Sequence, residues 1–284
     1  MESSTNGHAY RVEVISESRR GDGHHKLLKV AGGNAVQAVK QYGRKRSQFR
    51  VLLRSIGNLT YAGKSSILIA ERMRTEAATL ELWTREGIDV PRLIPREDAL
   101  NGVRDPALIL EWISGPSLLE RFEDPELPLE SKLDLMRRFT AIWCHRHDRA
   151  IALNEPRLIY EHPTFAHVLL SGDRFVHIDF EIVFTSQRRL ERQMQREILG
   201  FIRSLAKVEP AEHIDPLIRA FAESYESRDR LQRLVREAQN RILLRIDGLK
   251  RSRRKTGMTK RATLARIQSH IDAAPIAVPE PARS

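Results

Sequence analysis

The chain has 284 residues, 41% of them hydrophobic and 6% aromatic, which is enough apolar material for one large domain or two lobes with a proper core. No apolar run approaches the roughly 20 residues that a membrane-spanning helix needs, and the N-terminal stretch MESSTNGHAY lacks the apolar region of a signal peptide. The single cysteine, Cys144, excludes an internal disulfide framework, so we expect a cytoplasmic protein in a reducing environment.

Basic residues outnumber acidic ones by 48 to 37, which gives a net charge of +11 at pH 7. Much of the excess lies in residues 44–54 and in residues 249–261. Such a balance favours polyanionic partners: nucleic acid, an anionic membrane surface at the inner membrane, or a phosphorylated substrate. A solvated basic surface without a partner is the alternative.

The first third of the chain is rich in predicted strands. Alternating or apolar runs predict strands at 11–16, 26–31, 35–42 and 107–113. The second and third are joined by the tight turn Gly32-Gly33-Asn34. Helical periodicity is strong over 66–86 and weaker in the basic stretch 43–65.

The rest of the chain is mainly helical in pattern. Predicted helices cover 118–122, 129–147, 187–207, 215–227 and 228–250, and two short apolar strands lie at 168–170 and 175–178. The Pro-rich end, 274–284, has the composition of an unstructured segment.

These elements predict an α+β protein with two lobes. We expect a disordered N-terminus at 1–9, a small β-rich N-lobe at 10–113, a mainly helical C-lobe at 114–250, and a basic, partly disordered tail at 251–284.

A lysine and a glutamate stand out as a predicted pair. On the 66–86 helix, Glu76 lies on the same stripe as Met73, Leu80 and Trp83. A carboxylate on an apolar face is costly unless it is paired. Lys40, at the end of the 35–42 strand, is the natural partner. A Lys–Glu pair of this kind holds the lysine on nucleotide phosphates.

Two glycines ahead of Lys40 are candidates for a phosphate-covering loop. Gly21 and Gly23 lie between two predicted strands, where small residues would let backbone N–H groups approach a phosphate. An ordinary hairpin turn explains them equally well.

The segment LIYEHPTFAHVLLSGDRFVHIDFE, residues 158–181, carries the strongest candidate. Asp179 ends an apolar strand, where its carboxylate can hold Mg²⁺ against phosphates; a turn or capping aspartate is the alternative. The loop ahead contains His162, whose imidazole can act as a base, and His167. The two histidines could instead bind Zn²⁺, but no cysteine or third histidine has matching spacing.

Taken in order, Gly21/Gly23, Lys40, Glu76, GIDVP (87–91), LILEWISG (108–115), HPTFAH and IDFE resemble the layout of protein-kinase-like phosphotransferases. The details are most similar to the bacterial lipopolysaccharide-core sugar kinases and to atypical kinases of the RIO and Bud32 type. The resemblance covers about residues 10–207. It implies a bilobal protein-kinase-like fold, ATP and Mg²⁺ as cofactors, and phosphate transfer to a hydroxyl.

The resemblance also implies individual roles. Lys40 would bind phosphates with Glu76 as its partner, Asp179 would bind metal, and the backbone around Glu111 and Ile113 would contact the adenine. Three positions depart from the pattern: Tyr160 replaces a usual histidine, His162 the catalytic aspartate, and His167 the second metal-binding asparagine.

We therefore expect an ATP-dependent phosphotransferase acting on a hydroxyl of an anionic acceptor, either a lipopolysaccharide-core sugar or a protein Ser/Thr. His162 and Asp179 would be the catalytic residues, and Asp179 and His167 the metal ligands. The alternatives are a catalytically degenerate pseudokinase that serves as a nucleotide-binding or scaffolding module and, on charge alone, an RNA-associated protein.

Overall fold

The structure is a computed structural model that describes residues 3–5, 8–18, 25–32, 35–42, 63–65, 68–95, 107–244 and 258–273. Several predictions lie outside these residues: the glycine turn with Gly21 and Gly23, most of the basic stretch 43–65, and the Pro-rich end. Within the described part of the chain, no helix combines the length and the apolar character needed to cross a bilayer.

The N-lobe is built on one antiparallel sheet whose five strands follow sequence order. These strands are β1 (Ser3–Thr5), β2 (His8–Ser18), β3 (His25–Gly32), β4 (Ala35–Tyr42) and β5 (Ala107–Glu111). Successive side chains of a strand point to opposite faces. Val39 on β4 therefore joins Val30 and Ile109 in a small cluster, whereas Ala38, on the other face, joins the main core. Lys40 shares the face of Ala38.

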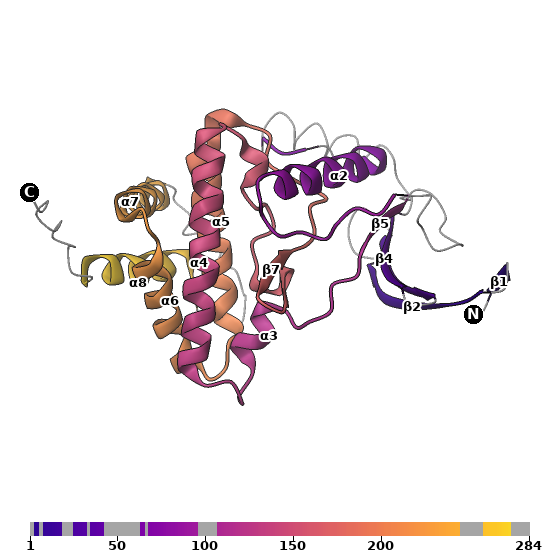
Figure 1. The fold of residues 1–284 in the computed structure, drawn as a ribbon. Helices are drawn as coiled ribbons and strands as arrows, with labels where there is room; N and C mark the ends of the chain where they lie inside the picture. Colours follow the sequence, from indigo (N-terminus) through magenta and orange to yellow (C-terminus); the bar gives the residue numbers. More distant parts are fainter. Residues whose placement is uncertain are drawn as a thin grey trace, which may run out of the picture.

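One long helix, α2 (Ile69–Arg85), accompanies the sheet (Figure 1). Its buried stripe includes Glu76, Leu80 and Trp83, with exposed fractions of 2%, 2% and 0%. After the helix, the Asp89 carbonyl accepts a hydrogen bond of 3.0 Å from the His177 amide, which ties this segment to the second, smaller sheet.

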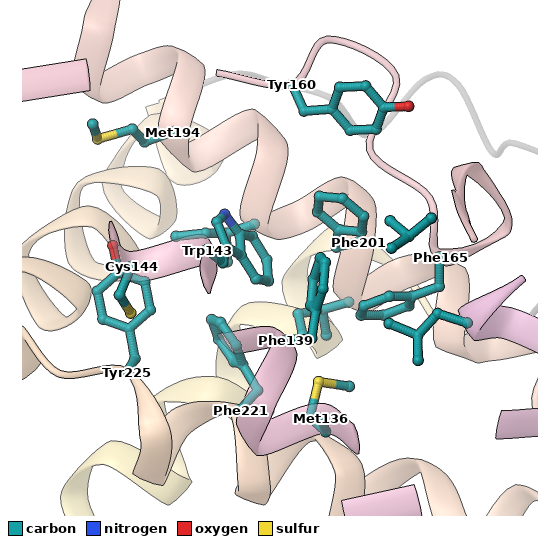
Figure 2. Close-up of a cluster of buried hydrophobic side chains, with 14 of the residues drawn as sticks. Met136, Phe139, Trp143, Cys144, Tyr160, Phe165, Met194, Phe201, Phe221 and Tyr225 are labelled. Carbon is teal, nitrogen blue, oxygen red and sulfur yellow. The ribbon is translucent and has the colours of Figure 1, made fainter. Parts of the chain in front are cut away.

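The C-lobe consists of helices around an aromatic core. They are α3 (Leu118–Glu123), α4 (Leu129–Ala152), α5 (Leu190–Ser204), α6 (Ile214–Ser224), α7 (Arg228–Leu244) and α8 (Lys260–Ala273). Phe139 and Trp143 of α4 contact Phe201 of α5, with ring centroids 5.4 and 4.8 Å apart, and Trp143 lies 5.0 Å from Phe221 of α6 (Figure 2). Cys144 is buried in the same core.

A two-stranded hairpin lies between the sheet and the helices (Figure 1). It comprises β6 (Val168–Ser171) and β7 (Arg174–His177), whose register pairs Val168 with His177. Gly172 in the turn has φ +61°, a conformation that glycine adopts without strain. This hairpin delivers Asp179 to the space between the lobes.

The expected two-lobed α+β plan is therefore present, with a β-rich N-lobe and a helical C-lobe. Two details differ. The predicted helix over 187–207 is an α-helix flanked by single 3₁₀ turns at Gln187–Arg189 and Leu205–Lys207. Residues 260–273, for which the sequence predicted no helix, form α8, which lies against α5, α6 and α7 and buries Leu264 and Ile267.

Candidate active site

The site begins with the predicted lysine–glutamate pair, which is present in the structure. Lys40 of β4 donates to both carboxylate oxygens of Glu76 on α2, at 3.0 and 2.8 Å. The Lys40 side chain is 14% exposed and that of Glu76 is 2% exposed, so the pair is shielded from water and Glu76 has the partner that its burial demands.

Tyr42 also contacts the Lys40–Glu76 pair, and the sequence analysis did not predict this residue as part of the site. Its hydroxyl donates to Glu76, and its ring lies 5.8 Å from Lys40 Nζ. Burial, with the Glu76 charge second, raises the pKa of Tyr42 far above its usual value, so the phenol stays protonated. Tyr42 and Lys40 are two residues apart on one strand and therefore share a face, which is the signal that could have identified it.

Two more carboxylates face Lys40. Its Nζ lies 3.5 Å from Asp179 Oδ1 and 3.0 Å from Glu181 Oε1. The second oxygen of Glu181 contacts Arg72, which stands one turn before Glu76 on α2. Lys40 of β4 and Arg72 of α2 are the two cations that join α2 to the segment after β7. They bind three carboxylates, those of Glu76, Asp179 and Glu181.

Asp179 is held in an unusual backbone conformation. Its φ of +72° lies in the left-handed region, which is costly for a residue other than glycine. The flanking residues fix it: the Ile178 amide donates to the His167 carbonyl at 3.0 Å, and the Phe180 ring packs 4.7 Å from Trp83. Burial alone would raise the pKa of Asp179, but Lys40, His167 and His162 outweigh it and lower the pKa, so the carboxylate is ionised.

The loop before β6 holds a buried carboxylate that the sequence pattern did not indicate. Glu161 has a side chain only 6% exposed, and it contacts the ammonium of Lys64. His162 Nδ1 lies 3.0 Å from Glu161 Oε2. Burial by itself raises the pKa of Glu161, but His162 and Lys64 together lower it. The ionised carboxylate of Glu161 thus interacts with both Lys64 and His162.

His162 is the residue predicted as base, and its contact with Glu161 shifts its pKa. The contact with Glu161 raises the pKa of His162 above 6.5, although burial opposes this. Because Nδ1 faces Glu161, Nε2 is the ring nitrogen left to meet a substrate. Nothing in the sequence pattern separates Glu161 from an ordinary surface glutamate.

His167, the other predicted metal residue, faces Asp179. Its Nδ1 atom is shielded from solvent and lies 3.9 Å from Asp179 Oδ2. Burial lowers the pKa of His167, although the charge of Asp179 opposes the shift, and the neutral form of its ring can serve as a metal donor. Asp179 suits Mg²⁺ as an oxygen ligand, and His167 adds a nitrogen donor beside it. Among the described residues, no three His, Cys, Asp or Glu side chains gather as a metal cluster.

A buried ionic group supports the start of this loop. Glu197 of α5 is fully buried and accepts a 3.0 Å hydrogen bond from the Tyr160 amide. Its carboxylate also binds Arg146 and lies 2.7 Å from His147 Nε2, both from α4. Arg146 and Glu197 lie on apolar helix faces, where a charged side chain needs a partner. The same pattern indicated Glu76 and could have indicated these two residues. They hold Tyr160, and with it Glu161, in place.

Lys64 reaches Glu161 because a short segment of the N-lobe pairs with the chain after Asp179. The Ser65 amide donates to the Val183 carbonyl at 2.9 Å, and the Thr185 amide donates to the Gly63 carbonyl at 2.8 Å. Lys64 lies opposite Phe184 in this pairing. It is a second lysine of the site that the sequence did not indicate.

Glu111 ends β5, and Ile113 follows in the linker to the C-lobe. The linker is fastened to β6, because Leu170 donates from its amide to the Pro116 carbonyl at 2.9 Å. The contacts of Glu111 and Ile113 with adenine stay predictions, as do the phosphate contacts of Gly21 and Gly23, which lie outside the described residues.

No described protein family matches the chain, and no curated protein is similar to it in sequence. Among solved structures it is similar to a crystal structure of a kinase domain, with 11% identity and a TM-score of 0.37, over 92% of this chain and 83% of the other. It is also similar to Plasmodium vivax ethanolamine kinase, with 11% identity and a TM-score of 0.34, over 92% of this chain and 82% of the other.

Proposed function

We propose that the protein is an ATP-dependent, kinase-like phosphotransferase that acts on a hydroxyl of an anionic acceptor, with a lipopolysaccharide-core sugar as the first candidate. The observation that carries this proposal is the position of Lys40: it is bound to Glu76 and lies 3.5 Å from Asp179, although the three residues come from separate parts of the chain. In phosphoryl transfer, a lysine held by a glutamate positions the phosphates, and a nearby aspartate holds the metal.

Each residue has a task in this proposal. Glu76 and Tyr42 fix the Lys40 ammonium for the phosphates, and Asp179 with His167 would hold the divalent metal, whose charge neutralises that of the phosphates. His162 takes the proton of the acceptor hydroxyl at Nε2, while Glu161 orients the ring through Nδ1 and stabilises the protonated form.

The site is tested first by nucleotide binding. ATP with Mg²⁺ at about 100 times its dissociation constant should stabilise the fold by about 2.7 kcal/mol, which is measurable as a rise in melting temperature. Lys40→Ala and Asp179→Ala should each reduce the rise. Wild-type protein that shows no rise at millimolar nucleotide would overturn the nucleotide site.

A pseudokinase is the second candidate, and the loop that carries His162 favours it. His162 stands where a carboxylate would hold and deprotonate the hydroxyl, and Glu161 raises its pKa, which increases the fraction already protonated near neutral pH. Incubation with ATP and Mg²⁺ separates the two candidates: hydrolysis or autophosphorylation supports the enzyme, and nucleotide binding without either supports the pseudokinase. Contact of the basic tail with an anionic membrane surface remains a separate proposal.

A further inference from the structure

Lys40 is surrounded by more carboxylate oxygens than its ammonium group can bind at one time. Its Nζ lies 3.0 and 2.8 Å from the two oxygens of Glu76, 3.5 Å from Asp179 Oδ1 and 3.0 Å from Glu181 Oε1. An ammonium group carries three N–H donors. All of them therefore have carboxylate partners, and a phosphate oxygen can bind Lys40 only if one of these partners leaves.

Two of the three carboxylates are fixed in place. Glu76 is buried on α2 and also accepts a hydrogen bond from the Tyr42 hydroxyl, so its departure would cost the contacts of two donors. Asp179 has a short side chain on a left-handed backbone, and the residues on either side of it are held by a hydrogen bond and by ring packing. Moving either carboxylate away from Lys40 would therefore disturb the surrounding structure.

Glu181 differs from these two carboxylates because a second cation holds it. Its Oε2 atom contacts Arg72, which lies one turn before Glu76 on α2. A buried negative charge is costly without a partner. If Glu181 Oε1 leaves Lys40, the carboxylate stays paired with Arg72, whose guanidinium can bind both carboxylate oxygens in a bidentate manner. The contact between Lys40 and Glu181 is therefore the least costly of the three to break.

We propose that Glu181 competes with the nucleotide for Lys40. Before the nucleotide binds, Glu181 occupies the lysine; a phosphate oxygen then replaces it, while Arg72 retains the displaced carboxylate. The inference rests on the proposed function and adds an intramolecular control on the nucleotide affinity of the same site. Lys40 keeps Glu76 throughout, so only one partner of the lysine is exchanged. Glu181 and Arg72 together set how tightly the nucleotide is held.

The first measurement is the dissociation constant of ATP, determined by calorimetry with and without Mg²⁺. Glu181→Gln should bind ATP roughly tenfold more tightly than wild type, because the phosphate no longer has to displace a charge-assisted contact. Glu223→Gln is the matched control: it also removes a glutamate from an ion pair, with Arg219 on the surface of α6, and should bind ATP as wild type does. Unchanged or weaker binding by Glu181→Gln overturns the proposal.

Glu181→Asp separates the local contact from the overall charge of the site. This variant keeps the negative charge, but its side chain is one methylene shorter and cannot span Lys40 and Arg72 as Glu181 does. It should therefore also bind ATP more tightly than wild type. Wild-type affinity in Glu181→Asp, with a gain only in Glu181→Gln, would show an effect of net charge and counts against the competition. The same variant provides the test should Glu181→Gln fail to fold.

Arg72 provides the third measurement. Without its guanidinium, the displaced carboxylate of Glu181 loses the charge that retains it, so Arg72→Gln should weaken ATP binding. That loss should disappear in R72Q/E181Q, and strictly additive effects of the two substitutions contradict the proposal. An ATP-dependent melting shift in wild type, with unchanged affinity in the Glu181 variants, overturns the competition alone. A wild type without that shift overturns the nucleotide site and the competition with it.

Discussion

The pH dependence of activity should report the contact between His162 and Glu161. A base must be unprotonated, and Glu161 raises the pKa of His162 above 6.5. Transfer activity should therefore fall as the pH drops through the raised pKa, at a pH above the ordinary value for histidine. The measurement is kcat/KM against pH, with histidine NMR titration as an independent record of the same group.

Variants of His162 and Glu161 separate the loss of the base from a change in its pKa. His162→Ala should lower turnover by about 10²–10⁴ with little change in nucleotide affinity. Glu161→Gln removes the negative charge, so the pKa of His162 should fall and the acid limb should move to lower pH. An active wild type with a fully active His162→Ala variant would exclude His162 as the base, whereas a wild type without transfer to any acceptor would favour the pseudokinase.

The neighbouring pair, Asp179 and His167, should influence the choice of metal. A nitrogen donor favours Mn²⁺ over Mg²⁺, which prefers an all-oxygen shell. We expect ATP to stabilise the protein more with Mn²⁺ than with Mg²⁺, and His167→Asn to reduce the difference. Melting temperatures with each metal measure this, and Asp179→Ala should remove the metal effect altogether. Equal responses in wild type and His167→Asn would exclude His167 as a ligand.

At the scale of elements, α8 is part of the C-lobe core. Leu264, Ile267 and Ile271 are at most 2% exposed, so truncation after Lys250 should lower the melting temperature sharply rather than leave it unchanged. Ile267→Ala should destabilise by roughly 2–5 kcal/mol. The matched control is Arg266→Ala, an exposed neighbour expected to change the free energy of unfolding by less than about 0.5 kcal/mol. Urea unfolding measures both, and a stable truncated protein would show that α8 is dispensable.

At the scale of the whole molecule, Gly115 sets how the lobes join. It has φ +147°, and a Cβ there would lie 1.7 Å from the Leu170 carbonyl oxygen, so only glycine lets the linker approach β6. Gly115→Ala should force the linker away from the hairpin and weaken both folding and nucleotide binding. Gly172→Ala is the control: it also has positive φ, but a Cβ there meets nothing within 4 Å, so its cost should be only about 1–2 kcal/mol. Equal unfolding free energies of the two variants would contradict this role.

The order of most elements and the centre of the site could be predicted from the amino-acid sequence alone. Strand alternation gave β4 with the predicted ends, and helical periodicity located α2 within a few residues. The cost of burying a charge then pointed from Glu76 to Lys40, which are 36 residues apart and in contact. These features were predictable because they follow from local patterns and from one unpaired charge on an apolar face.

The other side chains that complete the site could be identified only from the folded chain, because they come from distant segments. Lys64 and Glu161 are separated by 97 residues, and nothing in either segment marks the other as its partner. Arg72 meets Glu181 in the same way, through the placement of α2 against the segment after β7. The packing of α8 was equally hidden, because a basic sequence with a few apolar residues becomes a core helix only where α5, α6 and α7 present an apolar surface to it. Contacts of this kind depend on how distant segments are brought together, and that is set by the packing of the whole chain.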